Sequence, residues 1–380
     1  MPSILLDATS IPKQPVGAGV YIKNIVKGLL QSSSDFIFQI LAHKDDFPLF
    51  ELDETYQKHF VFQRDHSRGS RIFSEQINYP FIIKQGNYNL YHGLHYSFPL
   101  SKPCPSIVTI HDLTYFTHPE MHILLKRFYF KFFIKQACKS VDNILAISDN
   151  TKKDLLNLVN CDPEKITVTS LGVDGKYFKN WSDIELEKTK QKYDLPENFI
   201  LFMGLIEPRK NVPLLIRAYL NFVDHFDNNY HLVIAGRWGW ESKNILGEID
   251  CHPQKSKIHF LGYVEESEKP ALYQLANIFV YPSMYEGFGL PVLEAMASGT
   301  PVITTNISSM PEIVRDNGLL IEPNDQQALE NAIMTLVNDS SSRDSYSIKG
   351  KIKAHEFSWE NTVNQTLFAY EKVLSQRGKM

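Results

Sequence analysis

The segment over residues 278–304 constrains the fold more than any other part of the sequence, because it predicts a strand, a helix and a second strand in close succession. The apolar run Ile278, Phe279 and Val280 predicts the first strand. Pro291 suits the first turn of a helix, where no backbone N–H is needed, and Gly299 lies where that helix should end. A chain built from such units is expected to form a parallel sheet covered by helices.

The same alternation of strands and helices extends along the chain and predicts an α/β protein with two Rossmann-like domains. Strands are predicted over 3–6, 36–42, 88–92, 106–110, 143–147, 167–171, 199–203, 231–235, 258–261, 278–281 and 301–304. Helices are predicted over 20–30, 212–223 and 358–374, where apolar residues recur at helical spacing. Ligands in such sheets bind beyond the carboxyl ends of the strands, so two domains facing each other across a cleft would share one site.

The chain length also indicates two domains, because 380 residues are too many for one core of ordinary size. We expect an N-terminal domain over 1–175 and a C-terminal domain over 176–357. A final helix over 358–380 is expected to cross back to the N-terminal domain.

Composition indicates a cytoplasmic protein. The formal net charge of −4 argues against nucleic-acid binding, and the N-terminus has no basic region followed by a long apolar run, as a signal peptide would have. No stretch approaches the roughly 20 apolar residues of a membrane-spanning helix. The four cysteines, Cys104, Cys138, Cys161 and Cys251, show neither metal-site nor disulfide spacing, so reduced thiols are expected.

Two carboxylates, Glu286 and Glu294, flank the predicted start of the helix after the strand 278–281. A glycine-containing loop at a helix N-terminus offers unpaired N–H groups and the positive end of a dipole to hydroxyls and phosphates. The candidates for such ligand contacts in this segment are Glu286, Gly287, Phe288, Gly289, Leu290 and Glu294. The alternative is an ordinary helix N-terminus that tolerates acids, with Glu294 solvated.

A second candidate segment, Gly204 to Asn211, follows the strand 199–203 and leads into the helix 212–223. Arg209 and Lys210 lie beside the helix N-terminus, where cations oppose the helix dipole unless they share an anion. A diphosphate is such an anion, and arginine can bind it with two hydrogen bonds. The alternative is a solvated charge pair on a surface loop.

These two segments resemble those of the retaining family-4 glycosyltransferases with the GT-B fold. The resemblance implies that Glu286 contacts the transferred sugar, that Glu294 binds the ribose of the nucleotide, and that Arg209 and Lys210 bind the donor pyrophosphate. Cationic side chains would then stabilise the leaving diphosphate without a metal ion, and no cofactor or metal is expected.

Further matches to the family extend over most of the chain. The segment at Tyr263 and Val264 resembles the one whose backbone meets the nucleotide base, although Tyr263 could equally pack in the core. Gly17 and Gly19 resemble the family's N-terminal glycine loop, which faces the donor diphosphate or the acceptor. An ordinary turn between strand and helix is the alternative for that loop.

Three histidines lie at or just after the ends of predicted strands in the N-terminal half. His111 stands at the end of strand 106–110 and resembles the family's histidine near the reacting sugar, which implies an active-site role with Arg209, Lys210 and Glu286. His92 and His95 are weaker candidates for an acceptor-side loop, and they have no partners at metal-site spacing.

The segment 121–140 places Arg127, Lys131, Lys135 and Lys139 at a spacing of four residues, so one helix face is cationic. Phe128, Phe130, Phe132 and Phe133 add aromatic surface. This pattern fits either a buried helix with a solvated basic edge or peripheral contact with a membrane surface.

The sequence therefore predicts a retaining, metal-independent hexosyltransferase that uses UDP-glucose-type or GDP-mannose donors. The N-terminal domain would bind the acceptor, a glycan or a lipid-linked glycan in polysaccharide biosynthesis, and the C-terminal domain would bind the nucleotide sugar. The alternatives are a sugar phosphorylase or epimerase of the same fold, or a non-catalytic scaffold that binds a nucleotide sugar.

Overall fold

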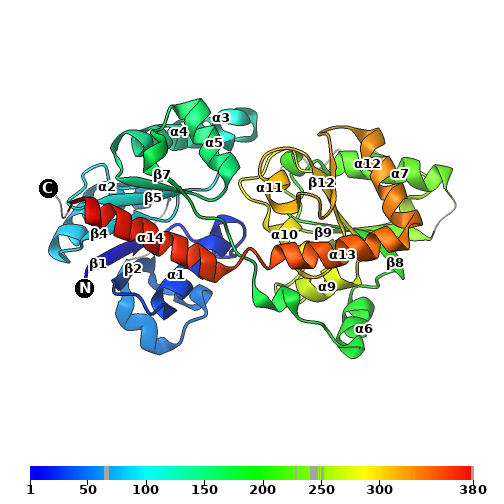
Figure 1. Cartoon of the computed structure of the whole chain (residues 1–380), viewed down its shortest axis with the longest axis horizontal. Helices are drawn as coiled ribbons and strands as arrows, with labels where there is room; N and C mark the ends of the chain where they lie inside the picture. The colour runs from blue at the N-terminus through cyan, green and yellow to red at the C-terminus, as the bar shows by residue number, and fades with distance from the viewer. Residues whose placement is uncertain (64–67, 227–228, 240–246, 248, 250–251, 378–380) are drawn as a thin grey trace. The chain divides into compact units, whose positions relative to one another are not determined.

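The computed structural model describes residues 1–63, 68–226, 229–239, 247, 249 and 252–377, and it divides into two compact units (Figure 1). Unit 1 comprises Met1–Gly172 and Ser358–Met380, and unit 2 comprises Val173–Phe357. Cys251 lies outside the described residues.

Unit 1 is built on a parallel sheet of seven strands in the order β3-β2-β1-β4-β5-β6-β7. The central strands are rich in β-branched and other apolar residues, as expected for a sheet covered on both faces. The strands are β1 Ser3–Asp7, β2 Ile37–His43, β3 Phe60–Gln63, β4 Leu90–Gly93, β5 Ser106–Ile110, β6 Asn143–Ala146 and β7 Ile166–Val168.

Helices cover both faces of the unit 1 sheet (Figure 1). The helices α2, α4 and α5 contribute buried residues such as Tyr79, Phe133 and Leu155 to one core, which also contains Val108 of β5. On the other face α1 packs against α14, so the C-terminal helix completes the first unit. The bounds are α1 Ala18–Gln31, α2 Arg68–Gln85, α3 Thr114–Thr117, α4 Leu124–Ser140, α5 Asp149–Val159 and α14 Trp359–Arg377.

Unit 2 is built on a second parallel sheet, with six strands in the order β10-β9-β8-β11-β12-β13. The strands are β8 Asn198–Met203, β9 Tyr230–Ala235, β10 Ile258–Gly262, β11 Ile278–Tyr281, β12 Val302–Thr305 and β13 Leu319–Ile321. Its helices are α6 Asp183–Lys192, α7 Val212–His225, α9 Lys269–Leu275, α10 Leu290–Ala297, α11 Met310–Val314, α12 Gln326–Asn338 and α13 Ser340–Ala354.

Several helices begin where a short polar side chain caps the first turn. Ser148 accepts a hydrogen bond from the backbone N–H of Thr151 at the start of α5. Ser182 and Glu185 form a reciprocal capping box at α6, and Asp339 caps α13. Such caps satisfy N–H groups that have no partner within the helix.

Both sheets have the doubly wound strand order, in which the direction of winding reverses between the first and fourth strands. The reversal lies between β1 and β4 in unit 1, and between β8 and β11 in unit 2. Loops on either side of this point diverge and leave room for a ligand beyond the carboxyl ends of the strands. In unit 2, these loops carry Arg209, Lys210 and Glu286.

The predicted α/β class and the pair of Rossmann-like folds are confirmed. The prediction of a strand over 167–171 was too long, because the observed strand is Ile166–Val168. Strands Phe60–Gln63 and Leu319–Ile321 were not predicted, since they are short edge strands with little periodic signal. Among the described residues, no helix combines the length and apolar character needed to cross a membrane.

Candidate active site

Arg209 and Lys210 lie in the loop after β8, at the carboxyl edge of the unit 2 sheet. The short turn Pro208–Lys210 carries both cations, and Asn211, with a φ of 53°, turns the backbone into α7. The sequence predicts that two cations at this place need a shared anion. In the structure both side chains contact the carboxylate of Glu286.

Lys210 is buried, with 9% of its side chain exposed. Its Nζ donates hydrogen bonds to the hydroxyl of Tyr281, the last residue of β11, and to Oε1 of Glu286. Burial and the neighbouring charge of Arg209 lower the pKa of Lys210, while the carboxylate of Glu286 opposes this. A buried ammonium of this kind is stable only while it stays paired.

Arg209 connects the two loops. Its Nη1 lies 2.7 Å from Oε2 of Glu286 and donates a hydrogen bond of 2.6 Å to the carbonyl of Tyr285, while Nη2 donates to Oε1 of Glu207 at 2.8 Å. Burial lowers the pKa of Arg209, but the two carboxylates outweigh this effect and the pKa is raised. The guanidinium is therefore charged and held in a defined orientation.

Glu286 is fixed through both its backbone and its carboxylate. Ser283 Oγ donates to Oε1 at 2.8 Å, the Glu286 N–H donates to Ser308 Oγ at 3.0 Å, and Ser309 Oγ donates to the Glu286 carbonyl at 3.0 Å. Burial raises the pKa of Glu286, but the charges of Arg209 and Lys210 outweigh it and lower the pKa to about 2. The carboxylate is therefore ionised at neutral pH.

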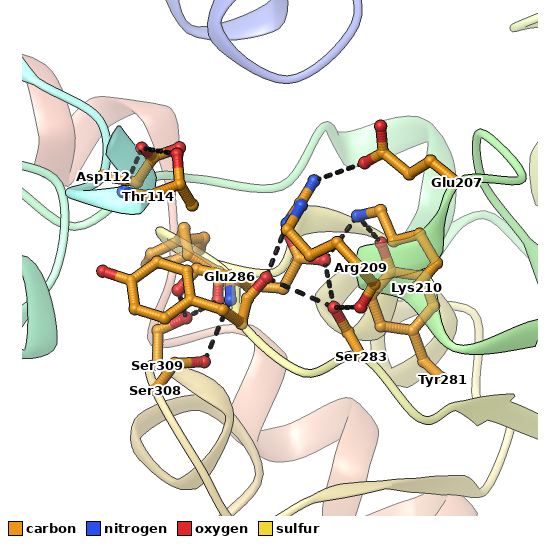
Figure 2. Close-up of polar contacts among 12 residues, drawn as sticks. Asp112, Thr114, Glu207, Arg209, Lys210, Tyr281, Ser283, Glu286, Ser308 and Ser309 are labelled. Carbon is orange, nitrogen blue, oxygen red and sulfur yellow. Dashed lines mark hydrogen bonds and ion pairs between the residues drawn. The ribbon is translucent and has the colours of Figure 1, made fainter. Parts of the chain in front are cut away.

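Figure 2 shows Arg209, Lys210 and Ser283 converging on the carboxylate of Glu286. Two cations face two carboxylates, Glu286 and Glu207, so the buried charges balance one another. The donors are already oriented by these contacts. Such an arrangement can stabilise a diphosphate with little reorganisation, and it leaves the Glu286 carboxylate able to accept from hydroxyls.

Glu294 lies in the second turn of α10 and makes its contacts elsewhere. Its Oε2 accepts a hydrogen bond of 3.1 Å from Tyr273. Burial and, to a lesser degree, the charge of Glu266 raise the pKa of Glu294, and the ammonium of Lys269 opposes this. The structure thus gives the two glutamates different surroundings. The ribose contact by Glu294 stays a prediction.

The glycine loop between the two glutamates is tightly packed. Gly289 has a φ of 119°, and a Cβ at this position would lie 2.2 Å from Cε of Met310. Gly287, Phe288 and Leu290 are buried beside it. The close approach that requires glycine at 289 is therefore to Met310, and contact of this loop with a ligand stays a prediction.

The predicted base-binding segment follows β10. Tyr263 is exposed and its ring lies 4.3 Å from the guanidinium carbon of Arg237, whereas Val264 is buried. Tyr263 therefore does not serve as core packing, and Arg237 lies over its ring. Its contact with a nucleotide base stays a prediction. Gly204 lies against Gly236, because a Cβ added at Gly236 would lie 1.8 Å from the carbonyl oxygen of Gly204.

In unit 1 the two glycines of the first loop have different roles. Gly17 caps α1 with a φ of 52°, and a Cβ there would meet nothing within 4 Å. A Cβ at Gly19 would lie 2.8 Å from Cγ and Cδ of Pro12. Packing against Pro12 therefore explains the glycine at 19, and contact of this loop with a phosphate stays a prediction.

His111 follows β5 directly and is buried. Its Nε2 donates a hydrogen bond of 2.9 Å to the carbonyl of Leu94, and its ring centroid lies 5.4 Å from that of His95. Burial lowers the pKa of His111, although Leu94 and Asp112 oppose this. Within the described residues, Nδ1 of His95 is buried and has no hydrogen-bond partner. The structure thus brings His95 and His111 together.

His92 lies in the core of unit 1, which corrects our prediction of an acceptor-side role. It is fully buried, with Nδ1 2.6 Å from the Tyr370 hydroxyl and Nε2 2.9 Å from Thr109 Oγ1. Burial lowers its pKa to about 3, so the ring is neutral. His92 ties α14 to β4 and has no ring nitrogen left for an acceptor.

Sequence reasoning missed several residues that hold the cluster in place. No local pattern marks Tyr281, Ser283 or Ser309 as site residues, and only folding brings Ser309 to Glu286. Glu207 gave a local signal, because a carboxylate two residues before Arg209 can pair with it. Across the described part of the chain, no group of three or more histidine, cysteine, aspartate or glutamate side chains is arranged to hold a metal ion.

Comparison with known proteins gives two family matches. The model of Glycosyl transferases group 1 matches residues 183–353, and that of Glycosyltransferase Family 4 matches residues 15–176. The O-antigen chain mannosyltransferase B of Escherichia coli is 36% identical over 283 residues, which are 74% of this chain and 74% of that protein.

Solved structures show the same fold. A sucrose-phosphate synthase from Thermosynechococcus elongatus superposes with a TM-score of 0.78 at 20% identity, covering 99% of this chain and 100% of that one. HepE from Anabaena, solved in complex with UDP-glucose, gives a TM-score of 0.75 at 19% identity, covering 98% and 99%. The predicted GT-B fold is therefore confirmed.

Proposed function

The chain belongs to the Glycosyl transferases group 1 family, and on this premise we propose that it is a retaining, metal-independent hexosyltransferase. Its donor would be a nucleoside diphosphate sugar, and its acceptor a glycan or lipid-linked glycan in polysaccharide biosynthesis. The observation that carries this proposal is the cluster of Arg209, Lys210 and Glu286, which lies where the winding of the unit 2 sheet reverses between β8 and β11.

Arg209 and Lys210 are the groups that stabilise the leaving diphosphate in this proposal. The bond between the anomeric carbon and the phosphate oxygen breaks in an oxocarbenium-like transition state, and negative charge develops on the diphosphate. Two oriented cations in a buried site stabilise that charge more effectively than water does. They would thus replace the divalent metal that other nucleotide-sugar enzymes use.

Glu286 positions the transferred sugar. Its carboxylate is ionised and fixed by Ser283, so it can accept hydrogen bonds from sugar hydroxyls while its contacts to the cations hold the diphosphate donors in place. The acceptor hydroxyl attacks the face that the diphosphate leaves, and the departing phosphate oxygen takes the acceptor proton. The configuration of the anomeric carbon is thereby retained.

The remaining donor contacts are assigned to unit 2. Glu294 binds the ribose, Tyr263 stacks on the base, and the backbone of Val264 and of the loop 287–290 lines the donor site. His111 and His95 of unit 1 are assigned to the sugar and the acceptor, because His95 has a buried nitrogen without a partner among the described residues.

Mannose is the sugar favoured by the comparisons. The E. coli relative at 36% identity is named as an O-antigen chain mannosyltransferase, whereas the UDP-glucose complex of HepE comes from a structure at 19% identity. We therefore propose GDP-mannose as the first donor to test and UDP-glucose as the second.

A thermal-shift panel of nucleoside diphosphates and their sugars tests the proposal, because a ligand that binds the native state raises the melting temperature. GDP and GDP-mannose should give the largest shifts, and Arg209→Ala should abolish them. Transfer of labelled mannose to a lipid-linked glycan without added metal completes the test. Binding without any transfer or hydrolysis would instead identify a scaffold, and a product phosphorylated at the anomeric carbon would identify a phosphorylase.

A further inference from the structure

The helix α4 of unit 1 presents an exposed face that the proposed reaction does not use. Leu124, Phe128, Phe132, Lys135 and Lys139 are all exposed and follow one another at a spacing of three or four residues, which places them along one stripe. The stripe is apolar over its first turns and cationic over its last turns. Leu125, beside it, is 79% exposed.

The opposite side of α4 is anchored in the core. Phe133, Ile134, Ala137 and Cys138 are buried there. Four phenylalanines of this segment were predicted to add aromatic surface. Phe133 instead lies in the core and Phe130 packs against that core, whereas Phe128 and Phe132 are exposed as predicted. The orientation of the exposed stripe is thus set by packing.

The helix α2 repeats this arrangement. Phe73, Ile77, Phe81 and Lys84 are exposed at a spacing of three or four residues, so this helix also has an apolar stripe that ends in a cation. A surface hollow beside this stripe is lined by Ile77, Pro80, Phe81 and Pro103, with Lys84 among its polar residues. A hydrocarbon chain fits such a lining better than a polar ligand does.

The two stripes belong to one face of unit 1, because α2 and α4 contribute to the same core cluster. Both helices connect parallel strands of one sheet, so they run in the same direction. Their apolar ends therefore lie toward the carboxyl edge of the strands, the edge at which His111 is found, and their cationic ends lie toward the opposite edge. We call these stripes together the α2–α4 face.

Charge distinguishes the possible occupants of this face. The sequence of α4, LLKRFYFKFFIKQACKS, contains five basic residues and no acidic residue. In a two-fold dimer this face would meet its own copy, which would bring two sets of basic residues together without an acidic partner on α4. An anionic lipid surface instead attracts these basic residues, and it also accepts apolar side chains between its head groups.

We propose that the α2–α4 face docks on an anionic lipid bilayer. Leu124, Leu125 and Phe128 of α4 and Phe73 of α2 insert among the head groups, while Lys135 and Lys139 bind lipid phosphates. The carboxyl edge of the unit 1 sheet is thereby held close to the membrane surface. The face lies in unit 1 and the Arg209 cluster in unit 2, so failure of vesicle binding and failure of the proposed transfer are distinguishable.

Sedimentation of the full chain with vesicles tests the proposal. Wild type should pellet with vesicles of phosphatidylcholine and phosphatidylglycerol, should pellet less at high salt, and should stay in solution with phosphatidylcholine alone. Because each cation near an anionic surface strengthens partition about fivefold, the pair Lys135→Gln and Lys139→Gln should weaken it roughly 25-fold. The pair Leu125→Ser and Phe128→Ser should weaken it at least about tenfold through lost apolar burial.

Matched variants in unit 2 provide the controls. Ile184→Ser with Ile352→Ser removes apolar side chains that are 70% and 66% exposed, and Lys188→Gln with Lys349→Gln removes two exposed cations. Both pairs should leave vesicle binding unchanged, and all variants should keep the wild-type melting temperature and nucleoside diphosphate affinity.

Three results would overturn the proposal. These are no pelleting of wild type above the vesicle-free control, equal loss in the control pairs, and a dimer in sedimentation velocity that Leu125→Ser with Phe128→Ser converts to a monomer while vesicle binding is absent. The last result would show that the face binds a second copy.

Discussion

Replacing Lys210 with methionine tests whether the Arg209, Lys210 and Glu286 cluster is held together by charge. Methionine keeps the apolar stem of the side chain and removes the ammonium that donates to Tyr281 and Glu286. The variant therefore separates loss of charge from loss of volume.

The expected cost follows from the contacts that remain. Removing one partner of a buried ion pair typically costs about 3–5 kcal/mol, because the other charge is left buried and unpaired. Here Glu286 keeps Arg209 at 2.7 Å and Ser283 at 2.8 Å. We therefore expect a loss at the lower end of this range, about 3 kcal/mol of the free energy of unfolding.

A double-mutant cycle measures the pair itself. Lys210→Met, Glu286→Gln and the double variant are unfolded in urea, and the transition of unit 2 is compared with that of unit 1. Unit 1 contains neither residue and serves as an internal control. The double variant leaves neither charge unpaired, because Arg209 still contacts Glu207, so its cost should be smaller than the sum of the single costs by about 2 kcal/mol.

Additive costs would refute this reasoning. If the two single losses sum to the loss of the double variant within about 0.5 kcal/mol, the two charges do not stabilise each other in the folded protein. An equal shift in both unfolding transitions would show that the substitutions act on the whole chain instead of on the cluster.

Three further predictions concern other parts of the protein. Glu286→Ala should slow transfer more than it weakens nucleoside diphosphate binding, whereas Glu294→Ala should weaken both; calorimetric titration showing equal affinity losses would contradict this division. Burial raises the pKa of Glu75 from its ordinary value of 4.5 to about 7 despite the charge of Arg71. The folded protein therefore favours the protonated carboxyl, and the stability that this group contributes is fully present below pH 4.5 and is lost as the pH rises through 7. Glu75→Gln should remove this loss of about 3 kcal/mol, and urea unfolding with an unchanged pH dependence would contradict it. Transfer should persist in excess EDTA, and a loss that Mg²⁺ restores would contradict metal independence.

The segment 278–304 shows what local sequence predicts well. The predicted strand, helix and strand correspond to Ile278–Tyr281, Leu290–Ala297 and Val302–Thr305, because apolar runs, Pro291 and Gly299 act over a few residues. Short strands such as Leu319–Ile321 were missed, since three residues carry too little pattern and their pairing with β12 decides them.

The candidate site shows the limit of the same reasoning. The dipole argument predicts that Arg209 and Lys210 share an anion, but local sequence cannot show that Glu286, far along the chain, supplies it. The position of a strand end likewise suggested that His92 belongs to an acceptor-side loop. Its burial depends on Tyr370 in the last helix, which packs there only in the folded unit.

The most direct test of the central claim is the transfer of mannose from GDP-mannose by wild type and by Arg209→Ala, with the anomeric configuration of the first product read by NMR. We predict a product with the anomeric configuration of GDP-mannose. The rate of Arg209→Ala should fall on the order of 100-fold or more, because the leaving diphosphate loses an oriented hydrogen-bond donor. An inverted product, or a variant as active as wild type, would contradict the central claim.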